Sequence, residues 1–225
     1  MSEKLILQKS IKPIEYRSLG EITAEKLRKA IIRGELPSGE RITEMDISEN
    51  MGISRVVVRE AIQMLISEGL LTKERNKYTM IVNLTEKDIE DIFELRIALE
   101  QTAAKRCINK TFVMKELVNL VKELQLYVER GQEDSIILME KDILIHRCLV
   151  HRSMNIRLIK AWDEIYGPMM LLLHRYIRSE QKVILSHQEI IYAMETGDKD
   201  ALMEKIEAHI EDTKQRLLEN CNKIV

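Results

Sequence analysis

The spacing of apolar residues changes character near residue 83. Before it, helical periods of three to four residues alternate with stretches in which every second residue is apolar, and beyond it only helical periods occur. The first part predicts three helices, which begin at the capping residues Ser18, Thr43 and Ser54 and end near Gly34, Met51 and Glu68. It also predicts two strands, from Leu70 to Arg75 and from Tyr78 to Asn83.

Two of these helices are joined by a short turn at Gly52, which is typical of a helix-turn-helix, and the strand pair after it resembles a wing. The remainder predicts about six helices, over residues 85–109, 112–130, 133–151, 154–178, 180–196 and 198–221, with Gly167-Pro168 expected to kink or split the fourth. The predicted fold is therefore mainly α: a winged helix-turn-helix over residues 12–83, followed by an all-α helical bundle over residues 84–225.

Composition narrows the class of protein. Charged residues make up 32% and aromatic residues 4% of the chain, so leucine, isoleucine, valine and the 12 methionines must supply most of the core. No apolar run approaches 18 residues, and the three cysteines are widely spaced, so we expect a cytoplasmic protein without a membrane partner. The net charge of −2 does not by itself indicate a nucleic-acid binder.

The placement of basic residues does indicate one. In a helix-turn-helix the first residues of the second helix meet base edges in the major groove, and here they include Ser54, Arg55 and Arg59. Arg55 and Arg59 are one helical turn apart, so they share a face, and arginine matches guanine well. The predicted hairpin adds three cations suited to phosphate contact: Lys73, Arg75 and Lys77.

A carboxylate and three imidazoles fall on the apolar faces of three predicted helices in the second part: Asp142, His146, His187 and His209. A single histidine on such a face is more often a core residue, but four groups of this kind are costly to bury unless they meet. Together they predict a site for a divalent metal ion, with zinc the first candidate and nickel or manganese as alternatives.

Several runs of sequence also carry a resemblance to a known family. Residues 30–39, 52–62 and 68–70 look like the winged helix-turn-helix of GntR-family bacterial transcription regulators, and residues 93–100, Asp142-x-x-x-His146 and Ser153-Met-Asn155 are similar to motifs of the FadR-type ligand domain known as FCD. Met154 departs from the usual glycine of the last motif, Ile145 from a phenylalanine, Val56-Val57 from a common Thr-Pro, and Asn76-Lys77 from a glycine-containing wing.

The resemblance implies a homodimeric, metabolite-responsive regulator rather than an enzyme, with the four ligands holding a metal beneath an effector cavity. Two reading heads about one DNA turn apart would suit a palindromic double-stranded operator. We expect the effector to be a small organic acid that completes the metal coordination and contacts Arg96, Asn155 or Arg175. For Arg96, an interhelical salt bridge with a nearby glutamate is an equally good interpretation.

Three alternatives stay open at this point. The helical half could be a hydrolase-like metalloenzyme, although four protein ligands leave no obvious general base. The metal could be purely structural in a regulator that responds to something else, or the metal itself could be the signal. The sequence does not separate repression from activation.

Overall fold

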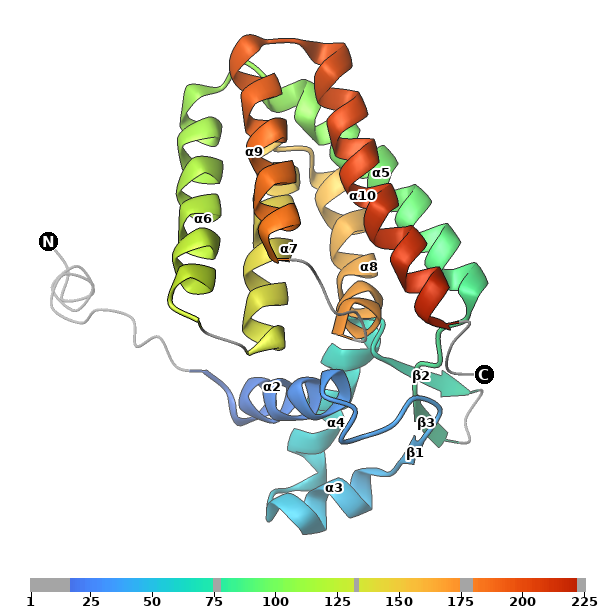
Figure 1. Cartoon of the computed structure of the whole chain (residues 1–225). Coiled ribbons are helices and arrows are strands. Elements are labelled where there is room, and N and C mark those ends of the chain that lie inside the picture. Colours follow the sequence, from blue (N-terminus) through green and yellow to red (C-terminus); the bar gives the residue numbers. More distant parts are fainter. Residues whose placement is uncertain (1–16, 75–77, 132–133, 175–179, 222–225) are drawn as a thin grey trace, which may run out of the picture.

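The computed structural model describes residues 17–74, 78–131, 134–174 and 180–221, and within them two parts are stacked end to end (Figure 1). The N-terminal part consists of α2 (Leu19–Ile32), β1 (Arg41–Ile42), α3 (Glu44–Met51), α4 (Arg55–Ser67), β2 (Leu71–Glu74) and β3 (Tyr78–Ile81). The second part is a bundle of α5 (Glu86–Cys107), α6 (Thr111–Glu129), α7 (Ser135–Arg152), α8 (Ile156–His174), α9 (Glu180–Thr196) and α10 (Lys199–Cys221). The predicted mainly α fold is confirmed.

Local capping sets the helices of the N-terminal part. Ser18 and Glu21 form a reciprocal capping box at the start of α2, and the hydroxyl of Thr43 accepts from the amide of Asp46 at the start of α3. Gly52 follows α3 with φ 64°, a left-handed conformation that glycine adopts without strain, and turns the chain toward α4. These contacts place α3 and α4 as a helix-turn-helix.

The small sheet has the strand order β1-β3-β2, with both pairings antiparallel. In the wing, Leu71 pairs with Ile81 and Lys73 with Thr79, and β1 adds Arg41 opposite Met80 on the other side of β3. The sequence did not predict β1, because a two-residue strand has no periodicity of its own and forms only where β3 supplies the hydrogen bonds.

The buried residues Val58, Ala61, Ile62 and Leu65 pack α4 against the N-terminal core. In the bundle, the fourth helix is not split at Gly167-Pro168, one of the two expected outcomes, because α8 continues from Ile156 to His174 through the proline.

Gly167 and Pro168 instead form the joint between the two parts. A Cβ atom on Gly167 would lie 2.1 Å from the carbonyl oxygen of Glu68, so only glycine lets α8 approach the end of α4 this closely. On the other side of the joint, Gly69 has φ 71° and packs against the Pro168 ring. Helix α8 is thus in direct contact with Glu68 and Gly69, the two residues that follow α4, the second helix of the helix-turn-helix.

The bundle core is continuous. Helix α10 packs along α5 and α9, while α7 packs against α5, α6 and α8 (Figure 1). Among the described residues, no helix is both long and apolar enough to cross a lipid bilayer.

Candidate metal centre and DNA-reading helix

The four predicted ligands meet in the bundle interior. Asp142 and His146 come from α7, His187 from α9 and His209 from α10, and one ligand atom of each lies within 4.8 Å of all the others. All four side chains are buried. The Nε2 atoms of His187 and His209 each lie 3.1 Å from Nε2 of His146, and Asp142 Oδ1 lies 3.6 Å from Nε2 of His187.

The outer nitrogen of each ring identifies its tautomer. His187 Nδ1 lies 2.8 Å from the carbonyl oxygen of Val183, which can only accept, so Nδ1 carries the proton. Ser186 donates its hydroxyl proton to the same carbonyl at 2.9 Å, and therefore accepts from His209 Nδ1 at 2.7 Å. His146 Nδ1 donates to Glu100 at 2.6 Å.

All three Nε2 atoms consequently present lone pairs to a common point. Lone pairs of neutral imidazoles that face each other at 3.1 Å repel, and a cation between them removes that repulsion. Nε2 atoms 3.1 Å apart are close enough for one ion to bind both at a usual metal–nitrogen distance of about 2.1 Å. The donor set therefore fits a divalent metal ion.

Burial and neighbouring charges act on the same groups. Burial lowers the pKa of His209 well below its usual value, and the adjacent His187 and His146 lower it further. Burial alone would raise the pKa of Glu100, but the charges of His146 and Arg96 and their hydrogen bonds outweigh it, so the pKa of Glu100 is lowered. The interior thus favours a neutral His209 ring and an ionised Glu100 carboxylate.

Glu100 and Ser186 contact the histidines of the cluster, and sequence reasoning missed both. Glu100 is 1% exposed and contacts both His146 and Arg96, whose Nε donates to the second carboxylate oxygen at 2.7 Å. A usable signal existed, because Arg96 and Glu100 lie one turn apart on the apolar face that Phe93, Ala103 and Cys107 also occupy. A charged pair on such a face must be buried together.

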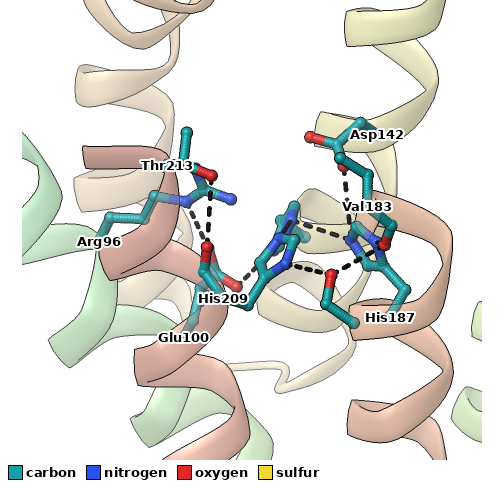
Figure 2. Close-up of polar contacts among 9 residues, drawn as sticks. Arg96, Glu100, Asp142, Val183, His187, His209 and Thr213 are labelled. Carbon is teal, nitrogen blue, oxygen red and sulfur yellow. Dashed lines mark hydrogen bonds and ion pairs between the residues drawn. The ribbon is translucent and has the colours of Figure 1, made fainter. Parts of the chain in front are cut away.

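The three residues predicted to contact the effector lie in different surroundings. Arg96 is completely buried, and its Nη1 and Nη2 atoms have no hydrogen-bond partner although Nε is paired with Glu100. Figure 2 shows Arg96 and Asp142 on opposite sides of His209. Asn155 instead caps α8, with its side-chain oxygen accepting from the amide of Arg157 at 3.1 Å. Arg175 lies outside the described residues.

Space at the centre is limited. A cavity of about 20 Å³ lies beside Glu100, His146 and His187 and is otherwise lined by apolar side chains. That volume holds about one water molecule. A wider groove of about 300 Å³ opens between α9 and α10 on the outer side of Ser186 and His209.

Of the predicted DNA contacts, four lie in the described part. Ser54 caps α4 by accepting from the amide of Val57, and Arg55, Arg59 and Lys73 are exposed. Arg59 forms a two-point ion pair with Glu44 of α3, at 2.9 and 2.7 Å. Val56, 72% exposed, lies between the two arginines in sequence. Arg75 and Lys77 fall outside the described residues.

Comparison with known proteins agrees with both parts of the structure. Residues 19–81 match the family described as bacterial regulatory proteins, gntR family, and residues 91–212 match the FCD domain.

Full-length relatives extend the similarity. The chain is 28% identical to the HTH-type transcriptional regulator YdhC of Bacillus subtilis, over 82% of this chain and 84% of that protein. It is 27% identical to the gluconate operon transcriptional repressor of the same species, over 89% of this chain and 85% of the repressor.

Solved structures share the fold. A GntR transcriptional regulator from Rhodococcus sp. RHA1 superposes with a TM-score of 0.71 at 24% identity, covering 90% of this chain and 99% of that one. The chain therefore belongs to the GntR family of bacterial regulatory proteins, as a DNA-binding transcriptional regulator of the FadR type with a C-terminal FCD domain rather than an enzyme.

Proposed function

We propose that this regulator is a repressor whose operator binding is controlled by a small organic acid bound beside a divalent metal ion. The observation that carries the proposal is the convergence of three Nε2 lone pairs and the Asp142 carboxylate in a buried site. Residues 12–83 would read DNA, and residues 84–225 would hold the metal, bind the effector and form the homodimer. Relatives named as repressors favour repression.

The ligand set favours zinc, because imidazole nitrogens with one carboxylate suit it, and nickel or manganese are alternatives. Asp142, His146, His187 and His209 would hold the ion. A bound divalent ion supplies a Lewis-acidic position for an oxygen donor of the effector.

Arg96 would recognise the other end of that acid. Its two Nη atoms are buried and lack partners, whereas a buried guanidinium normally has acceptors for its N–H groups. A carboxylate is the acceptor that matches two parallel N–H donors. Asn155 is occupied as a helix cap, so Arg96 is the stronger candidate.

Binding of such an acid requires movement of helices. The cavity beside Glu100, His146 and His187 holds only about one water molecule, so side chains of α5, α7 or α9 must shift to admit an organic acid there. Helix α8 packs against α5 and α7 and contacts Glu68 through Gly167, so a shift would reach the end of α4. Coupling of this kind is typically about 1–3 kcal/mol.

At the DNA, Arg55 and Arg59 would contact base edges and Lys73 the phosphates of a palindromic operator. The exposed Arg59–Glu44 ion pair does not oppose this, because an exposed ion pair contributes less than a contact with a base edge. The methyl groups of the exposed Val56 suit a thymine methyl group.

Operator titration tests the proposal. A duplex selected from random sequences would be titrated with metal-free protein, zinc-loaded protein, and zinc-loaded protein with each of a set of small organic acids. We expect zinc plus one acid to change operator affinity about 5- to 150-fold, with no effect of that acid on metal-free protein. An acid that acts equally without metal would contradict the proposal.

The small cavity favours a second candidate function, in which the metal ion acts without an organic acid, either as a structural ion or as the signal itself. In that case no acid changes operator affinity. Chelation then separates the two cases: loss of folded protein indicates a structural ion, and altered operator binding by folded protein indicates a metal sensor.

A further inference from the structure

Glu100 is the one charged residue among the Nδ1 partners of the three imidazoles. His187 and His209 use a backbone carbonyl and a serine hydroxyl, both neutral, whereas His146 uses a carboxylate that is 1% exposed. The second oxygen of this carboxylate accepts from Arg96 Nε at 2.7 Å. One side chain therefore contacts both a metal ligand and the arginine that faces the interior.

We propose that Glu100 is a positioning residue that fixes His146 in its Nδ1–H tautomer and holds Arg96 in place, so that the metal site and the arginine are linked through one carboxylate. This inference rests on the proposed function and goes beyond it by assigning the linkage to a specific residue. Glu100 is not one of the four proposed metal ligands. It acts only through its contacts with His146 and Arg96.

A carboxylate can serve both neighbours because it offers two acceptor oxygens to two donors, His146 Nδ1–H and Arg96 Nε–H. A glutamine in its place offers one acceptor and one donor. If its oxygen faces His146, its NH₂ group opposes Arg96 Nε–H. If its oxygen faces Arg96, its NH₂ group requires an unprotonated Nδ1, and His146 must move its proton to Nε2.

The second arrangement is the favoured one in Glu100→Gln. A buried guanidinium loses more than a neutral ring when its acceptor is removed, so Arg96 keeps the oxygen. The proton on His146 Nε2 then points at the metal position and blocks that ligand. Loss of such an outer partner typically lowers metal affinity about 10- to 100-fold.

Nitrogen NMR of histidine-labelled, metal-free full-length protein reads the tautomer directly, and competition with a chelator measures zinc affinity. In the wild type we expect a protonated Nδ1 on His146. In Glu100→Gln we expect the proton on Nε2 and an affinity for zinc lowered about 10- to 100-fold.

The double variant Arg96→Met/Glu100→Gln gives the sharper test. Without Arg96 the glutamine oxygen is free to accept from His146 Nδ1, so the original tautomer should return and zinc affinity should recover to within about threefold of the wild type. A merely structural role of Glu100 predicts no such recovery. The double variant also removes the buried charge that could prevent the single variant from folding.

Ser186→Ala is the matched control, because it removes the neutral partner of His209 and leaves His146 and Arg96 untouched. Its His146 signals should match the wild type. An unchanged His146 tautomer in Glu100→Gln, or no recovery in the double variant, would overturn the inference. If wild-type protein does not bind zinc, the proposed function fails, while the tautomer measurement still decides the role of Glu100.

Discussion

Each of the three imidazole rings is oriented by a hydrogen bond at its Nδ1 atom. The partner of His187 lies one turn earlier on the same helix, and the partners of His146 and His209 lie on neighbouring helices. Val183, Ser186 and Glu100 hold the Nδ1 protons, so the Nε2 atoms are committed to the interior before any ion arrives. Such prior orientation would reduce the entropy lost if the proposed metal ion binds. It also makes the metal-free site electrostatically unfavourable, because neutral lone pairs face one another.

This arrangement has a consequence for pH. The pKa of His209 is lowered in the folded, metal-free protein, so below pH 6.5 the unfolded chain binds a proton that the folded chain does not. Stability is then complete above about pH 7.5 and decreases as the pH falls through 6.5, by up to about 1.4 kcal/mol per pH unit for one proton. The lowered pKa of Glu100 acts only at more acidic pH.

Urea unfolding of metal-free protein at pH 7.5, 6.5 and 5.5 measures this slope. We expect His209→Asn to have a shallower slope than the wild type between pH 6.5 and 5.5. Equal slopes would show that His209 is not held neutral by the fold.

Met154 illustrates a single-residue departure from the family pattern. It has φ 56° and is 74% exposed, so a bulky side chain occupies a left-handed position, where glycine is favoured, without packing in return. It lies in the turn between α7 and α8, and its exposed side chain does not shape the metal centre.

We expect Met154→Gly to raise the free energy of unfolding by about 0.5–1 kcal/mol. The control is Met45→Gly, an exposed residue inside α3, which should lower it by about 1 kcal/mol. Chemical denaturation measures both, and a destabilising Met154→Gly would contradict the backbone explanation.

Helices and strands whose ends are marked by nearby residues in the sequence could be predicted. Elements that depend on contacts with distant parts of the chain could not. Ser18, Thr43 and Ser54 mark helix starts through their own side chains, and the sequence predicted all three. Strand β1 was missed because its hydrogen bonds come entirely from β3. The convergence of Asp142, His146, His187 and His209 could be predicted because polar groups interrupt apolar faces, whereas the contacts of Glu100 depend on how α5 and α7 pack.

Helix α4 is the element that should set DNA affinity. We expect Arg55→Ala or Arg59→Ala to weaken operator binding by about 1–3 kcal/mol, which is about 5- to 150-fold, through loss of a base contact. Fluorescence anisotropy with the selected operator measures this change. Arg157→Ala removes an exposed arginine from α8 of the bundle and is the control. Operator affinity that survives both α4 substitutions would exclude α4 as the reading helix.

The close approach of α8 to α4 depends on Gly167. In Gly167→Ala the new Cβ would overlap the carbonyl oxygen of Glu68, so α8 or the end of α4 must shift. We expect a loss of about 1–3 kcal/mol in the free energy of unfolding. Thermal unfolding measures it, with Gln188→Ala, an exposed helical position, as the control. No loss would mean that the two parts are not packed as tightly as the structure indicates.

In the whole molecule, α8 packs against α5 and α7 within the bundle and against α2 of the N-terminal part. The guanidinium of Arg96 lies 5.9 Å from the centre of the Trp162 ring, and Trp162 is completely buried on α8. Gly167 and Pro168 lie further along the same helix, against Glu68 and Gly69. A displacement of Arg96 could therefore reach the end of α4 through the contacts of α8 with Glu68 and Gly69.

The central claim, that Asp142, His146, His187 and His209 hold one metal ion, is tested most directly by titrating zinc into chelator-stripped protein and measuring the number of ions bound per chain. We expect one tightly bound ion per chain in the wild type and none in His187→Ala, with His151→Ala as a control that keeps the ion. A wild type that binds no zinc, or a His187→Ala variant that still binds one ion, would contradict the account.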